Sequence, residues 1–292
     1  MKIFAHISAL FVMTVWGMTF VNSKVLLLHG LLPDEIFLLR FIQAYLILLC
    51  LCHKRWMADT WKDELAFVAL GLSGGSVYFL AENTALVYST SSNVSIIVGS
   101  TPILTALLVG AVYRDERLNG RQWVGTLIAF VGMALIVLNG QLLLHLNPLG
   151  DMLALVASAT WAVYSLLMRR MMSRYNSVFI TRKVFFYGLL TVIPVFLLTG
   201  HDPFRSDLLA DPVVAFNLLF LGVIASTLCY FLWTRVLDTI GTVRATNYIY
   251  LQSFVTMLTA AFVLGERITW MAIMGVVTLI AGLVLASKQK QA

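Results

Sequence analysis

The chain has 292 residues, of which 60% are hydrophobic and only 12% are charged. A polar shell cannot be built around so apolar a chain, which excludes a soluble globular domain and leaves the lipid bilayer as the solvent. The net charge of +6 does not indicate a nucleic-acid partner, because the basic residues lie in short breaks between apolar segments.

Ten apolar segments follow one another, each close to the length of about 20 residues that crosses a hydrocarbon core. The expected spans are 4–28, 35–52, 65–88, 92–112, 121–140, 150–169, 179–199, 213–235, 245–263 and 269–287. Lipid cannot satisfy backbone polar groups, so each span is predicted to be an α-helix. The expected fold is therefore an all-α integral membrane protein with ten transmembrane helices.

The two halves repeat one pattern, a Glu-Arg pair followed by two glycines. It occurs at Glu116, Arg117, Gly125 and Gly132 and again at Glu266, Arg267, Gly275 and Gly282. We expect one five-helix repeat at 1–140 and a second at 141–292. Because five is odd, the second repeat enters the bilayer inverted, as in many secondary transporters. The glycines predict close helix contacts, and each glutamate is expected to accept hydrogen bonds from the start of the helix that follows it.

The distribution of basic residues predicts the topology. All but four of the 20 lysines and arginines fall on one side if the spans alternate, and the exceptions are Lys24, Arg40, Arg205 and Arg267. Since basic loops remain in the cytoplasm, both termini are expected there, in a multi-pass protein of the inner (plasma) membrane.

Among the charged residues inside the predicted spans, three stand out, because a charge in the bilayer costs on the order of 3 kcal/mol. Lys24, Arg40 and Glu82 are expected at similar depth near the outer side. In one interpretation Glu82 binds a proton, the candidate coupling ion, or a cationic substrate group, while Arg40 or Lys24 forms a gate or holds a carboxylate. In the other interpretation the three side chains only neutralise one another.

Aromatic and polar groups within the spans are candidates for a substrate cavity, since amphipathic rings suit small amphiphiles. The candidate substrate-binding residues are Trp16, Tyr78, Glu82, Asn83, Pro102, Trp161, Tyr164, Tyr230, Trp233, Tyr250 and Gln252. Pro102 also predicts a bend in the fourth span. Ordinary helix packing is the alternative for each aromatic residue.

The chain resembles the drug/metabolite transporter superfamily, in its EamA-type branch. The resemblance rests on the paired halves, a tryptophan in the first span of each, and the turns Arg114–Leu118 and Leu264–Ile268. It implies a secondary transporter that moves a small organic metabolite, such as an amino acid or an amphipathic amine, outward by alternating access around a central cavity. The alternative is a passive facilitator or channel without ion coupling.

An enzyme is not expected. The five histidines are scattered, and no zinc-protease, nucleophile-elbow or phosphate-loop motif occurs. Three cysteines give no disulfide framework and no metal site. The sequence therefore predicts no catalytic residues, no metal and no cofactor, with a small-molecule substrate and the lipid bilayer as partners.

Overall fold

The computed structural model describes residues 2–52, 54–89, 91–138, 147–264 and 268–287, and these residues form helices and short connections without a strand. The first half contains α1 (Lys2–Leu28), α2 (Pro33–Leu51), α3 (Trp61–Gly71), η1 (Leu72–Ser76), α4 (Val77–Tyr88), α5 (Ser91–Val98), α6 (Thr101–Val112), η2 (Arg114–Glu116) and α7 (Gly120–Leu138). The second contains α8 (Pro148–Met172), α9 (Ser177–Thr199), α10 (Ser206–Leu209), α11 (Pro212–Leu219), η3 (Phe220–Leu228), α12 (Cys229–Ile240), α13 (Thr242–Thr246), η4 (Asn247–Ile249), α14 (Tyr250–Leu264) and α15 (Trp270–Ser287).

All ten predicted spans coincide with helical segments to within a few residues, which confirms the all-helical fold. Within the described residues, seven helical stretches are long and apolar enough to cross a membrane. Three spans fall outside that group for visible reasons. α2 carries three charged residues, α13 to α14 is interrupted by η4, and the apolar part of α15 is slightly short.

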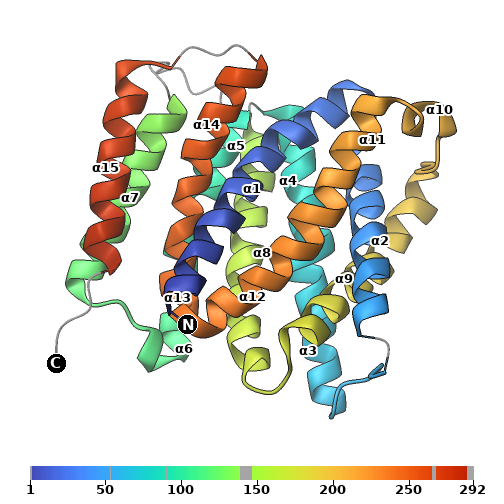
Figure 1. Cartoon of the computed structure of the whole chain (residues 1–292), viewed down its shortest axis with the longest axis horizontal. Coiled ribbons are helices and arrows are strands. Elements are labelled where there is room, and N and C mark those ends of the chain that lie inside the picture. Colours follow the sequence, from blue (N-terminus) through green and yellow to red (C-terminus); the bar gives the residue numbers. More distant parts are fainter. Residues whose placement is uncertain (1, 53, 90, 139–146, 265–267, 288–292) are drawn as a thin grey trace.

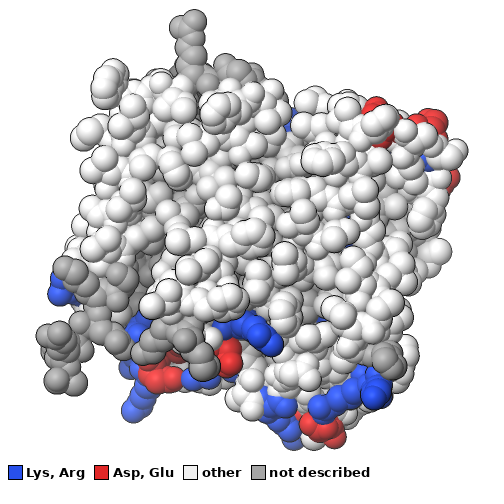
Figure 2. Space-filling view, in the orientation of Figure 1, with Lys and Arg blue, Asp and Glu red and all other residues white. Residues whose placement is uncertain are grey.

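The long helices run between two ends of the molecule, and consecutive spans alternate in direction (Figure 1). α1 begins and α15 ends at the lower end in this view. Charged side chains gather mainly at that lower end, with a smaller group at the upper right, and the broad band between them is largely free of charge (Figure 2). This distribution is the one expected of a protein that crosses a bilayer.

The repeated glycines form one shared contact. α7 and α15 stand side by side at one edge of the molecule (Figure 1). A Cβ on Gly132 would lie 2.3 Å from the Leu279 nitrogen and 2.8 Å from the Gly275 oxygen, and one on Gly125 would lie 2.8 Å from the Gly282 oxygen. The earlier glycine of each helix thus faces the later one of its partner, so the helices are antiparallel. The halves are therefore inverted at this contact, and the prediction of close approach is confirmed.

The Glu-Arg turn acts differently from the sequence expectation. Glu116 does not cap α7, the helix that follows it. Its carboxylate accepts hydrogen bonds from the backbone nitrogens of Thr242 (2.9 Å) and Val243 (3.1 Å), at the start of α13 in the other half. Arg117 Nε donates to the Gly110 oxygen (2.7 Å) at the end of α6. The turn therefore satisfies two helix ends and joins the halves. The second copy, Glu266 and Arg267, lies outside the described residues.

Four spans depart from a regular α-helix within their length. The third span of each half contains a π-helical segment, η1 and η3, and at Gly75 in η1 the backbone leaves helical geometry (φ −126°, ψ −107°). The fourth span breaks between α5 and α6, with Pro102 in the first turn of α6, and the ninth is interrupted by the 3-10 segment η4. The break at Pro102 agrees with the predicted bend, whereas the sequence analysis predicted neither π segment.

Candidate functional site

A small central cavity lies where the irregular spans meet the first spans of both halves. Its lining residues are Trp16, Thr19, Phe20, Arg40, Tyr78, Phe79, Glu82, Val98, Thr101, Trp161, Tyr230, Ile249 and Gln252. The cavity volume is about 30 Å³, space for only a few water molecules. A metabolite of many atoms cannot enter until the surrounding helices move apart.

Two opposite charges face this cavity. Glu82 is 9% exposed, and its carboxylate accepts a hydrogen bond from the Tyr78 hydroxyl (2.8 Å). Arg40 is 2% exposed, its Nε donates to Ser226 Oγ (3.0 Å), and its guanidinium lies 4.4 Å above the Phe79 ring. Neither residue takes part in a salt bridge within 4 Å among the described residues. The two charges are thus held near each other without closing on one another.

Aromatic rings enclose the charged pair. Trp16 meets Trp161 edge-on with ring centroids 5.5 Å apart, and it lies 5.5 Å from Tyr230 and 5.4 Å from Trp233. The indole nitrogen of Trp16 donates to the Ala225 oxygen (2.9 Å). By contrast, Trp161 Nε1 is buried and has no hydrogen-bond partner among the described residues. Trp161 lines the cavity, but its N–H has almost no accessible surface, so a ligand can reach this donor only once neighbouring side chains move.

Not every predicted residue reaches the cavity. Seven of them do, namely Trp16, Arg40, Tyr78, Glu82, Trp161, Tyr230 and Gln252. Tyr164 and Trp233 are buried directly behind the aromatic rings, and Tyr250 packs beside Phe130 in a separate cluster. Asn83 Nδ2 donates to the Pro33 oxygen (3.3 Å), and Pro102 is buried in α6.

Lys24 also lies apart from the other two charged residues. Its Nζ donates to the Leu86 oxygen (3.0 Å), and it does not line the cavity. Leu86 is one helical turn beyond Glu82, so the long lysine chain finds a carbonyl nearer the end of the span. The expected cluster of three is therefore reduced to Arg40 and Glu82.

Several cavity residues escaped the sequence analysis. Ser226, which binds Arg40, belongs to the π segment η3, and Thr19, Thr101 and Phe79 line the wall. Thr101 directly precedes Pro102. The proline, which predicts a bend, could therefore have pointed to Thr101 as a polar residue that lines the cavity. An isolated serine in an apolar span gives no comparable signal.

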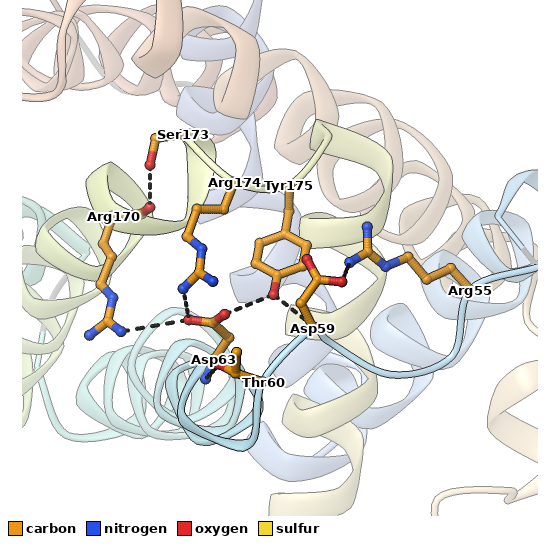
Figure 3. Close-up of polar contacts among 8 residues, drawn as sticks. All are labelled: Arg55, Asp59, Thr60, Asp63, Arg170, Ser173, Arg174 and Tyr175. Atoms are coloured by element: carbon orange, nitrogen blue, oxygen red, sulfur yellow. Dashed lines mark hydrogen bonds and ion pairs between the residues drawn. The ribbon is translucent and has the colours of Figure 1, made fainter.

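A second polar cluster closes the charge-rich end of the molecule. At the start of α3, the buried carboxylate of Asp63 receives Arg174 (2.5 Å), Arg170 (3.6 Å) and the Tyr175 hydroxyl (2.9 Å), all from the end of α8 and the turn after it (Figure 3). Burial raises the pKa of Tyr175 further above its ordinary value, so its hydroxyl keeps its proton and donates it in a hydrogen bond to Asp63. From the sequence alone, these basic residues indicated only the topology.

The neighbouring carboxylate, Glu64, extends the closure. It binds Lys183 and Tyr187 of α9 and accepts from the Ala58 nitrogen (2.8 Å). The opposite end is also tied, because Glu35 binds Arg205 (2.6 Å). The two halves are therefore tied to each other at both ends of the molecule.

A multi-pass, all-helical membrane protein with two inverted halves around a polar cavity belongs, as a class, to the transporters. The sequence profile described as the EamA-like transporter family matches residues 3–138 and 148–288. The chain therefore belongs to the EamA-like transporter family, within the drug/metabolite transporter superfamily.

Relatives span almost the whole chain. An "Uncharacterized transporter" of Archaeoglobus fulgidus is 29% identical over 291 residues, covering 98% of each chain. A "Probable amino-acid metabolite efflux pump" of Escherichia coli (strain K12) is 27% identical, covering 94% of this chain and 92% of its own. A solved structure titled "Crystal structure of protein" has a TM-score of 0.74 at 15% identity, covers 97% of this chain and 96% of its own, and shares the fold.

Proposed function

We propose that this transporter exports a small zwitterionic metabolite of amino-acid type by alternating access around the central cavity. The observation that carries the proposal is the pair of buried, opposite charges at Arg40 and Glu82, which face one cavity and form no salt bridge with each other in the described structure. A buried charge is costly unless it is paired. A ligand with a carboxylate and an ammonium group supplies both missing partners at once.

The lining supports distinct roles for the cavity residues. The Arg40 guanidinium and the unpaired Trp161 N–H are donors for the substrate carboxylate. Glu82 accepts the ammonium group, and the faces of Trp16 and Tyr230 add cation–π attraction. The relatives named as amino-acid metabolite efflux pumps agree with this substrate class.

We further propose that Glu82 carries the coupling proton. It is the carboxylate that lines the cavity, and Tyr78 holds it in place. Competition between a proton and the substrate ammonium for one carboxylate links their movements in opposite directions. The charge-rich end, where α1 begins and α15 ends, is assigned to the cytoplasm by the positive-inside rule.

The test is uptake of a labelled aromatic amino acid into inverted vesicles with an imposed pH gradient. Phenylalanine, its decarboxylated amine and its N-acetyl derivative separate the contributions of the two charges. We expect accumulation of the amino acid above equilibrium by the wild type, and little of either derivative. The variant Glu82→Gln should lose gradient-driven accumulation, while Asp207→Asn, the same change at an exposed carboxylate, should keep it.

Three other transport results would each contradict part of the proposal. Equilibration by the wild type without accumulation identifies a passive facilitator. Equal gradient-dependent accumulation by Glu82→Gln removes Glu82 from coupling. Preference for the amine over the amino acid refutes zwitterion recognition.

A further inference from the structure

A second, larger cavity lies away from the central site, at the charge-rich end of the molecule. It is bounded by α1, the segment from α12 to α14, and α15, and its volume is about 420 Å³. Small-molecule sites commonly enclose 300–1,000 Å³, so this cavity is of ligand size whereas the central one is contracted. Its polar residues are His6, Thr239, Arg244, Asn247 and Tyr248.

The polar residues gather at one end of this cavity. His6 lies near the beginning of α1, and its Nδ1 is 2.6 Å from the Tyr248 hydroxyl. Arg244 in α13 and Tyr248 in η4 both line the cavity. Arg244 is half-buried, and no described carboxylate lies within 4 Å of it. The rim therefore combines an unpaired cation with hydrogen-bonding groups.

The wall beyond this rim is apolar. Leu10 lies one turn deeper than His6 along α1, Leu251 follows Tyr248 into α14, and Ile280 and Leu283 lie in α15 before its end. Ile280 is 51% exposed. The cavity thus has a cationic rim at the membrane surface and an apolar wall toward the bilayer centre, the polarity profile of a phospholipid in the adjacent leaflet.

We propose that this cavity is a binding site for an anionic phospholipid. The phosphate binds Arg244 and the Tyr248 hydroxyl, and one acyl chain lies along Leu10, Leu251 and Ile280. The neighbouring cavity on the other side of α1 provides a contrast. It has a volume of about 570 Å³ and contains both Arg235 and Asp238, so it offers an anion no net attraction. The net positive charge at Arg244 is what selects the lipid headgroup.

The experiment uses the delipidated full-length chain in detergent, with the melting temperature followed by tryptophan fluorescence. We expect phosphatidylglycerol in mixed micelles to raise the Tm by roughly 5 °C at saturating concentration, and phosphatidylcholine to have little effect. Arg244→Ala should weaken the apparent affinity for phosphatidylglycerol about tenfold. Lys62→Ala, which removes an exposed positive charge at the same end but outside the cavity, should respond like the wild type.

A second variant tests the site independently, in case Arg244→Ala fails to fold. Ile280→Trp fills the apolar wall and leaves the cation intact, and it should also lose the response to phosphatidylglycerol. Native mass spectrometry should find fewer retained anionic phospholipids on both variants. Equal stabilisation by phosphatidylcholine, an equal shift with inorganic phosphate alone, or an unchanged response in both variants would overturn the proposal. These measurements involve no transport, so they stand or fall separately from the proposed export.

Discussion

The contact between α7 and α15 makes a quantitative prediction for Gly132→Ala. The new Cβ would lie 2.3 Å from the Leu279 nitrogen and 2.7 Å from its Cα, and both atoms belong to backbone. Ordinary carbon contacts lie near 3.5–4.0 Å, so the helices must separate by about 1 Å. Side chains cannot rotate to relieve this clash. The separation also weakens the contact at Gly275, whose oxygen lies 2.8 Å from the same Cβ.

The net cost follows from two opposing effects. Overpacking a close contact typically costs about 1–3 kcal/mol. Alanine regains up to about 1 kcal/mol, because it is a better helix former than glycine. The variant should therefore be destabilised by roughly 1–2 kcal/mol, which lowers the Tm by about 2–4 °C in a protein of this size.

Thermal unfolding of the purified protein, followed by tryptophan fluorescence, measures this change. Gly120→Ala is the matched control on the same helix, because its Cβ would meet nothing within 4 Å. The control should match or slightly exceed the wild-type Tm. An equal or higher Tm for Gly132→Ala would refute the argument that backbone contact between α7 and α15 holds the halves together.

Three further substitutions test other parts of the structure. Asp63→Asn removes the carboxylate that holds the closed end and should cost about 1–2 kcal/mol in thermal unfolding, whereas the same change at exposed Asp59 should cost under about 0.5 kcal/mol. Arg40→Lys should raise the KM for an amino acid about tenfold in vesicle uptake and leave that for its decarboxylated amine unchanged, because lysine cannot present a planar pair of donors. Tyr230→Phe should lower the free energy of unfolding by about 1 kcal/mol, since its hydroxyl donates to the Gly74 oxygen (2.8 Å), and an unchanged value would exclude that bond as a stabilising contact.

Hydropathy alone predicted the helices, because the bilayer imposes one length on every span and one solution on its backbone. The close α7–α15 contact could also be predicted from the sequence, since paired glycines allow a helix to approach any neighbouring helix closely. The hydrogen-bond partners of Glu116, by contrast, could not be predicted from the sequence. A capping motif indicates that helix N–H groups are satisfied, but the carboxylate reaches α13, which is distant in sequence. Contacts of this kind depend on how the halves dock.

The cavity residues likewise divide into those that the sequence could predict and those that it could not. Arg40 and Glu82 stood out because a charge in a span is costly and needs a reason. The sequence placed Lys24 with them by depth, yet depth does not determine which helix face a residue occupies or which carbonyl its side chain can reach. Ser226 could not be identified, because one serine among apolar residues is common and its role arises from the bond to Arg40.

The irregular segments explain how so small a cavity can serve transport. η1 supplies the Gly74 carbonyl to Tyr230, η3 supplies Ser226 to Arg40, and the breaks in the fourth and ninth spans adjoin the same cavity. A continuous α-helix resists bending because each turn is hydrogen-bonded to the next, whereas π and 3-10 segments interrupt that ladder. We infer that the cavity widens by rotation at these points while the α7–α15 contact stays fixed. In the widened state the rings part and lose contact energy, and under the proposed function a zwitterion would offset that loss by pairing Arg40 and Glu82. The substrate therefore favours the open geometry through contacts that the contracted cavity cannot offer it.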